Sequence, residues 1–318
     1  MPALPPLATE AIHAFIVGFI VLNVIIGMVT YVTLLERKFA ARMQSRIGPY
    51  RVGPHGLLQP IADALKLMMK EDIVPRLADR RVYNLAPIVF IVPCMLIFAT
   101  LPFAPGLGVA DLNIGILFFL AVSAMRAVNQ IISYDLPFIF VALIPVVLTG
   151  SLRLSDIAAA QAGMPFVLWA PYWFPLGPLA FLAYIVTTLA AENRVPFDIL
   201  EAESELIAGF RVEYSGMKFA LIQLGEYAHV IGTSFLGALL FLGAWSGPWS
   251  DTSLAWGATW FLLKAMFVFL LVTWIRWSFV RIRVDQILAI YWKLLLPASL
   301  VLLMATGLVV ALRSTGNS

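Results

Sequence analysis

Acidic side chains gather in one stretch of this sequence, between two long apolar segments. From Glu192 to Glu226 there are seven carboxylates and three basic side chains. Glu192 and Glu226 adjoin apolar segments, so we expect both near a membrane boundary, where charge repulsion and lost hydration favour proton exchange. The alternative is a solvated acidic loop with weak surface ion pairs, and charge alone favours neither hypothesis. The seven carboxylates are Glu192, Asp198, Glu201, Glu203, Glu205, Glu213 and Glu226.

Other polar side chains interrupt the apolar segments, namely His13, Asn23, Asp135, Lys264 and Lys293. Ionisable groups inside a membrane span are candidates for function and usually have partners. For the two lysines, extension of the amine to the membrane surface or a simple ion pair is the alternative.

The sequence predicts no cofactor site in this chain. The three histidines share no ligand spacing, which argues against a metal site. Cys94 is the only cysteine, which excludes a disulfide framework and a cysteine-ligated iron–sulfur cluster built by this chain alone. Neither a phosphate-binding glycine loop nor a Ser/His/Asp arrangement is present.

Long apolar runs position these polar residues. Of the 318 residues, 61% are apolar and 12% are charged, about half the charge of a soluble domain. This composition excludes a soluble enzyme, a nucleic-acid-binding module and a disordered chain. We predict an all-α polytopic membrane protein with a single membrane domain over residues 1–318.

Six segments match the roughly 20 apolar residues that a membrane span needs. A seventh region, 113–150, is interrupted by Arg126 and Asp135, and we interpret it as a shortened pair of helices, the third and fourth. The total is then about eight transmembrane helices. The six clear segments are Ile12–Leu35, Asn84–Phe103, Val167–Ala191, Ala228–Trp245, Leu254–Ile275 and Ile287–Leu312.

The positions of the basic residues predict the orientation. No Lys or Arg precedes Ile12, whereas residues 36–83 hold ten of the 21 basic residues. Cytoplasmic loops are rich in Lys and Arg, so the N-terminus is expected outside, on a retained first helix. The first loop, 36–83, and the acidic loop, 192–227, are expected in the cytoplasm.

The first cytoplasmic loop has its own structure. Glycines and prolines over 46–60 predict a compact, bent path. In the following segment, 61–74, the side chains of Ile61, Leu65 and Met68 share one face of an amphipathic interfacial helix, with Asp63 on another. The alternative is that this helix only anchors the loop to the membrane.

Taken together, the motifs in the loops resemble the H-subunit family of respiratory complex I, the proton-translocating NADH:quinone oxidoreductase, called subunit 1 in mitochondria. The resemblance covers nearly the whole chain. After Ala124, however, half a helix and a loop of the family are missing, and Asp135 replaces the usual Glu. The matching motifs are Glu36-Arg37-Lys38, 46–60 with Gln59, 62–66, 70–72, 192–198, 201–205, 212–215, 225–227, Arg276 and 281–286.

The resemblance implies a membrane-arm subunit of a bacterial inner-membrane complex that uses quinone as substrate. NADH, FMN and iron–sulfur clusters would lie in partner subunits. The chain would also contact small membrane subunits and lipid, and it would not bind nucleic acid. It implies a quinone chamber at Arg37, Phe39, Arg46, Gln59 and Asp63, a proton path at Asp135 and the seven carboxylates above, and structural or coupling cations at Arg194, Arg281, Arg283 and Lys293.

Two other functions remain open at this point. One is the homologous membrane subunit of a membrane-bound hydrogenase or of a ferredoxin- or deazaflavin-linked dehydrogenase. The other is a stand-alone secondary transporter, which usually shows an internal repeat that is absent here. The sequence does not distinguish ubiquinone from menaquinone, nor does it identify the carboxylate that changes protonation.

Overall fold

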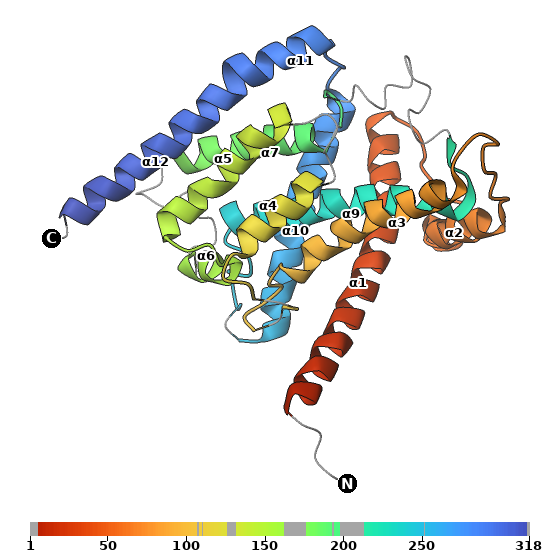
Figure 1. Ribbon diagram of the computed structural model, residues 1–318, viewed down its shortest axis with the longest axis horizontal. Coiled ribbons are helices and arrows are strands. Elements are labelled where there is room, and N and C mark those ends of the chain that lie inside the picture. The colour runs from red at the N-terminus through yellow and green to blue at the C-terminus, as the bar shows by residue number, and fades with distance from the viewer. Residues whose placement is uncertain are drawn as a thin grey trace.

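The computed structural model is a bundle of helices (Figure 1), described for residues 6–106, 108–109, 111–125, 132–161, 176–192, 194–197, 213–250 and 252–316. No β-strand occurs in these residues. The α-helices are α1 (Pro6–Met43), α2 (Gln59–Met69), α3 (Arg80–Leu96), α4 (Gly115–Met125), α5 (Ile132–Thr149), α6 (Leu154–Ala160), α7 (Leu176–Ala191), α9 (Gly216–Phe241), α10 (Leu254–Ser278), α11 (Val284–Ile290) and α12 (Leu296–Gly316). Short turns at Pro54–Gly56 and Ile97–Ala99 and a π-helical turn at Tyr291–Leu295 complete the described elements.

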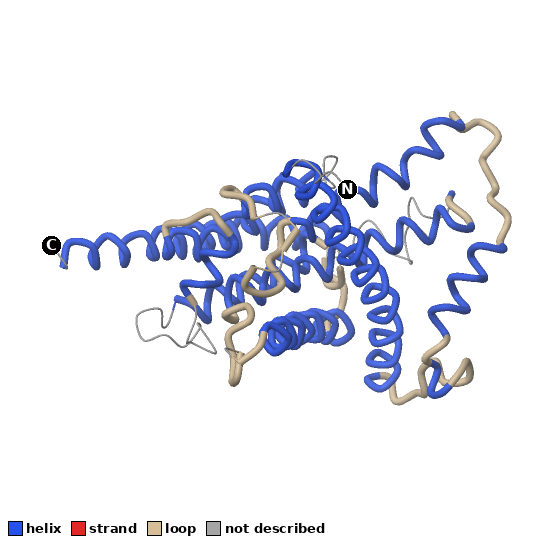
Figure 2. Tube along the Cα trace, turned by 90° about the horizontal axis from the view of Figure 1, so that it is seen from below, coloured by secondary structure: helices blue, strands red, loops and turns tan. Residues whose placement is uncertain are grey.

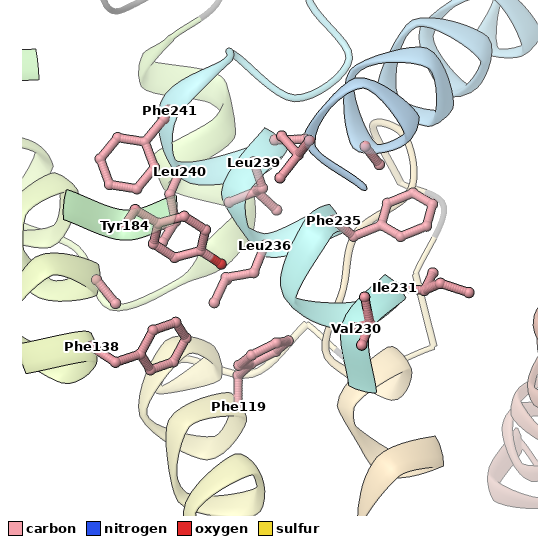
Figure 3. Close-up of a cluster of buried hydrophobic side chains, with 14 of the residues drawn as sticks. Phe119, Phe138, Tyr184, Val230, Ile231, Phe235, Leu236, Leu239, Leu240 and Phe241 are labelled. Carbon is pink, nitrogen blue, oxygen red and sulfur yellow. The ribbon is translucent and has the colours of Figure 1, made fainter. Parts of the chain in front are cut away.

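Helix α9 is the centre of the bundle. It contacts α3, α10, α1 and α2 along its length, and most of its side chains are buried. Figure 3 shows Phe235, Leu236 and Phe241 of α9 among aromatic side chains of the neighbouring helices, including Tyr184 of α7. An apolar helix that is buried all round is the expected core of a membrane bundle.

Small residues on α9 let its neighbours approach closely. A Cβ atom at Gly225 would lie 2.9 Å from the Phe90 ring, and one at Gly237 would lie 2.6 Å from the Tyr184 ring. Both distances are shorter than real contacts, so only glycine fits these positions without movement of an aromatic side chain. Helix association in a membrane depends on such close packing, because apolar burial alone does not favour it over lipid.

The number of membrane spans is confirmed only in part. Among the described residues, five helices are long and apolar enough to cross a membrane, or six if α5 and α6, which are bent by 62° at their junction, form one broken span. Helix α4 has 11 residues, about 17 Å at 1.5 Å per residue, shorter than a ~30 Å hydrocarbon core. Because residues 126–131 lie outside the described residues, the shortened helix pair and the count of eight both stay predictions.

Two helices extend beyond the apolar segments that predicted them. Helix α1 continues past Leu35 to Met43, and α9 begins at Gly216 rather than at Ala228. In both places the hydropathy falls but no proline breaks the helical backbone, and Gly225 in the α9 extension is accommodated within the helix, so each helix continues into the polar boundary. As a result, Glu36, Arg37 and Glu226 lie on helices rather than in loops.

The C-terminal helix covers one side of the bundle. Helix α12 packs against α5 and α7, and its last turns extend beyond the neighbouring helices (Figure 2). Val301, Met304 and Leu308 are exposed on its outer face. An exposed apolar helical face of this kind suits lipid or a neighbouring membrane subunit.

Candidate functional site

Three helices line an open cavity of about 300 Å³ at the end of α1 that precedes the first loop. Its walls are mainly apolar, and charged side chains gather on the side formed by α1 and α2. The cavity is lined by Val29, Thr30, Thr33 and Arg37 of α1, Pro60, Asp63, Ala64, Lys66 and Leu67 of α2, and Phe219, Ala220, Gln223, Leu224 and Tyr227 of α9.

Arg37 and Asp63, which line this cavity, form one polar group with Gln59. The Arg37 Nη1 atom lies 2.6 Å from Asp63 Oδ2, and Gln59 Nε2 donates to Asp63 Oδ1 at 2.9 Å. Gln59 and Asp63 are four residues apart on α2, which places them on the same face. Both oxygens of the carboxylate are thus used, and the guanidinium keeps further N–H donors for a ligand.

The apolar face of α2 turns away from the bundle. Ile61, Leu65 and Met68 are exposed, while Asp63 on the other face contacts α1. The amphipathic helix is confirmed as a helix, although it spans Gln59–Met69 rather than the predicted 61–74. Its exposed apolar side chains suit the interfacial position predicted for it.

A second cavity, of about 450 Å³, lies on the other side of Arg37. Arg46, Gly48 and Trp277 contribute to its walls. The Arg46 Nε atom donates to Gln44 Oε1 at 2.7 Å. Phe39 is half-buried but lines neither cavity. The structure therefore places Arg46 near Arg37 but on a separate wall from Asp63.

Glu36 is a buried carboxylate that holds three parts of the chain together. Its side chain is 4% exposed, and Oε1 accepts from Nη1 of Arg194 at 3.4 Å and from Nη1 of Arg276. Glu36 lies on α1, Arg276 on α10 and Arg194 just after α7. Because a buried charge without a partner is costly, this pairing has large energetic consequences.

The sequence analysis did not select Glu36 and Arg276 as site residues, although both occur in motifs that it quoted. The signal was present, because each is an ionisable residue near the inner end of a long apolar segment. Such a residue usually faces the interior of the bundle and has a partner. Only the fold showed that each is the partner of the other, since 240 positions separate them.

Arg194 connects Glu36 to two of the predicted carboxylates. Burial by itself would lower the pKa of Arg194, but Glu36, Tyr227, Glu192 and Glu226 together raise it above its ordinary value. Its guanidinium also lies 4.9 Å from the centre of the Tyr227 ring. Glu192 is buried and accepts a hydrogen bond from Thr233 Oγ1 of α9, and Glu226 is buried on α9. The name "buried charge group" is used below for Glu36, Glu192, Arg194, Glu226 and Arg276.

The remaining predicted residues line neither cavity or lie outside the described residues. The side chains of Glu213, Arg281, Arg283 and Lys293 are exposed. Asp135 lies on α5, but its side chain is outside the described residues. Also outside the described residues are Asp198, Glu201, Glu203 and Glu205.

Lys264 has a structural partner. Its side chain is buried, and Nζ donates to the carbonyl oxygen of Ser246 at 2.6 Å. This bond ties α10 to the turn that follows α9. No group of three or more His, Cys, Asp or Glu side chains that could hold a metal ion occurs in the part of the chain that the structure describes.

Comparison with known proteins identifies the family of the chain. The NADH dehydrogenase family model matches residues 16–125 and 121–307. The two matches meet where the sequence predicted a missing helix segment. The chain is 45% identical to the H subunit of the NADH-quinone oxidoreductase of Dehalococcoides mccartyi (strain 195) over 312 residues, covering 91% of this chain and 83% of that protein.

Similar relationships hold with other bacterial relatives. The corresponding H subunits of Geobacillus kaustophilus and Polaromonas naphthalenivorans are 42% and 41% identical, covering 93% and 90% of this chain and 94% and 88% of those proteins. The matches extend over the helices that form both cavities and the buried charge group. On the family match and these identities, the chain belongs to the NADH dehydrogenase family of membrane proteins that includes the H subunit of NADH-quinone oxidoreductase.

Proposed function

We propose that this chain is the membrane-arm subunit of a bacterial NADH:quinone oxidoreductase that forms part of the quinone chamber and couples quinone reduction to proton translocation. The observation that carries the proposal is the cavity between α1, α2 and α9, in which apolar walls meet the Arg37–Asp63 pair. The names of the relatives support the same reaction.

The cavity fits the two parts of a quinone. Apolar side chains such as Val29, Leu67 and Leu224 suit an isoprenoid tail, since burial of apolar surface stabilises it by about 25 cal/mol per Å². Arg37 offers N–H donors to a quinone carbonyl oxygen as the molecule passes. Electrons would come from flavin and iron–sulfur centres in partner subunits, which agrees with a chain for which the sequence predicts no redox ligands.

The buried charge group is suited to respond to that chemistry. Reduction of a quinone to the neutral quinol takes up two electrons and two protons, so nearby side chains that supply these protons would change their own charge. Tyr227 lines the cavity and also contacts Arg194, which connects the chamber to Glu36, Glu192 and Glu226. We propose that these carboxylates begin a proton path that continues, by family resemblance, through Asp135, Asp198, Glu201, Glu203, Glu205 and Glu213.

For topology, we propose eight crossings with both termini outside, the third and fourth helices lying in 113–150. Single cysteines at Gly108 and Ala159, in a Cys94→Ser background, should then react with an impermeant reagent from outside the cell. A cysteine at Leu77 should react only in inverted vesicles. Reaction of Gly108 and Ala159 from opposite sides would contradict the proposal.

The cavity is tested by Arg37→Met in the assembled complex. We expect the quinone KM to rise about tenfold, the effect of losing roughly 1.4 kcal/mol of binding, while NADH oxidation by an artificial acceptor at the flavin stays at the wild-type rate. Arg42→Met is the matched control, because Arg42 is exposed on the same helix. Equal quinone KM values in the two variants would show that the cavity does not bind quinone.

Two other functions predict different partners on purification. A hydrogenase-type homologue would purify with nickel–iron subunits, and a stand-alone transporter would purify alone. The NADH:quinone oxidoreductase proposal requires flavin and iron–sulfur subunits. The names of the relatives favour this last outcome.

A further inference from the structure

A set of polar contacts fastens the start of α9 to the segment that follows α2. Ser215 Oγ accepts from the backbone N–H of Ile73 at 3.0 Å and donates to the carbonyl oxygen of Glu71 at 3.0 Å. Ser215 is the N-cap residue of α9, yet its side chain makes no capping bond to α9. Serine usually caps its own helix at this position, so here its hydroxyl serves a contact between distant segments.

Tyr83 and Lys218 add to the same junction. The Tyr83 hydroxyl donates to the carbonyl oxygen of Glu213 at 2.6 Å, and its ring stacks on the ring of Tyr214 with centres 4.6 Å apart. Lys218 Nζ lies 4.5 Å from the centre of the Tyr83 ring and 2.6 Å from Asp72 Oδ2. The start of α9, the start of α3 and the segment 71–73 are therefore joined by contacts of several kinds.

The backbone at Gly216 shows how close the two segments are. Gly216 has φ +57°, and a Cβ atom there would lie 3.1 Å from the carbonyl oxygen of Lys70 and 3.5 Å from that of Leu67. A positive φ and a close approach of backbones both favour glycine. The first residue of α9 thus packs directly on the last turn of α2, with no side chain between them.

The junction adjoins the proposed quinone cavity. Leu67 and Lys66, in the last turns of α2, line the cavity, and so does Phe219 in the first turn of α9. A change in the distance between these two helix ends would therefore widen or narrow the cavity. It would also move α2, which carries Gln59 and Asp63, relative to Arg37 on α1.

We propose that Ser215, Tyr83 and Lys218 form a latch that fixes α2 against α9 and so sets the shape of the quinone cavity. They are positioning residues, because they act through α2 and not by contact with the quinone. The inference rests on the proposed function of the cavity. It assigns a role in quinone binding to residues outside the cavity lining and outside the predicted site.

The first test removes single hydroxyl groups. In membranes that contain the assembled complex, with decylubiquinone as the probe, Tyr83→Phe and Ser215→Ala should each raise the quinone KM about threefold to tenfold, because each removes a hydroxyl group that hydrogen-bonds at the junction. The kcat, the amount of complex and the flavin-site activity should stay at wild-type values. Glu71→Gln is the matched control, because the latch uses only the backbone carbonyl of this exposed residue.

A second test exchanges the charges of the ion pair. Lys218→Asp and Asp72→Lys should each raise the quinone KM, since each places like charges at the junction. The double variant restores an opposite pair and should return the KM most of the way to the wild-type value. A failure of the double variant to recover, with both single variants impaired, would overturn the pairing as a positioning contact.

Arg37→Met, measured in the same assay, separates this inference from the proposed function. A raised KM in Arg37→Met with normal KM values in Tyr83→Phe and Ser215→Ala overturns the latch alone. Normal KM values in all three variants overturn both. Loss of assembled complex without a change in KM shows a purely structural role and overturns the latch, as does a raised KM in the latch variants with a normal KM in Arg37→Met.

Discussion

Glu36 and Arg37 are neighbours on α1, yet they lie in opposite environments. Glu36 faces the interior, where it is 4% exposed and accepts from two arginines. The Arg37 side chain is 52% exposed and pairs with Asp63 beside an open cavity. A helix turns about 100° per residue, so adjacent positions can serve the core and the surface of a site. The pair shows that similar ionic contacts have different roles according to their access to water.

The first prediction removes the arginine from each of two ion pairs, Glu36–Arg276 and Arg37–Asp63, and has the largest expected effect. Arg276→Met leaves the buried Glu36 with Arg194, at 3.4 Å, as its remaining cationic partner among the described residues, whereas Arg37→Met leaves Asp63 in contact with water. We expect Arg276→Met to destabilise the protein by about 3–5 kcal/mol, the usual cost of breaking a buried pair. Arg37→Met should cost about 0–1 kcal/mol, as for an exposed pair.

The measurement is the amount of assembled complex and its midpoint of thermal inactivation in detergent. Arg42→Met, which changes an exposed arginine on α1, supplies the baseline. If Arg276→Met behaves like this baseline, the buried ion pair does not hold α1 to α10 in the assembled complex. In that case the contrast between Glu36 and Arg37 would be wrong.

The second prediction compares a buried carboxylate with an exposed one and has a smaller expected effect on stability. Glu192→Gln keeps an oxygen that can accept from Thr233 but removes the charge that faces Arg194. We expect quinone-coupled NADH oxidation to fall about tenfold, less than the 10²–10⁴-fold effect of a group that transfers a proton at the reacting centre. Oxidation of NADH by an artificial flavin-site acceptor should continue.

Glu213→Gln is the partner experiment, because the Glu213 side chain is exposed and only its carbonyl oxygen has a role in the latch. Its quinone-coupled activity should fall less than that of Glu192→Gln. The reverse order would assign coupling to the exposed loop and not to the buried charge group. Equal, wild-type activities of both variants would remove these two carboxylates from the proton path.

The end of α1 and the start of α9 show that hydropathy is a poor guide to helix ends. The sequence predicted that the first span ends at Leu35 and that the acidic loop extends to Tyr227. The structure continues α1 to Met43 and begins α9 at Gly216. Hydropathy reports the depth in the membrane, while helix ends depend on capping and on glycine or proline. The difference matters here because Glu36, Arg37 and Glu226 lie on these extensions.

Among the predicted chamber residues that the structure brings together, Gln59 and Asp63 have local spacing, whereas Arg37 is 26 positions from Asp63. Gln59 and Asp63 are four residues apart on one helix, a separation that a sequence pattern can reveal. Glu36, Arg194 and Arg276 come from three distant segments. Their pairing depends on how helices pack, which no local pattern specifies.

The sequence by itself determined the class of protein, the family and the amphipathic helix of the first loop. These depend on composition, on long apolar runs and on short motifs, all of which are local properties of the chain. Only the tertiary structure decided which charges are buried, which cavity Arg37 shares with Asp63, and that Ser215 bonds to the segment after α2 rather than to its own helix. The reason is physical: the energy of a charge or a hydroxyl group depends on its surroundings, and long-range packing creates those surroundings.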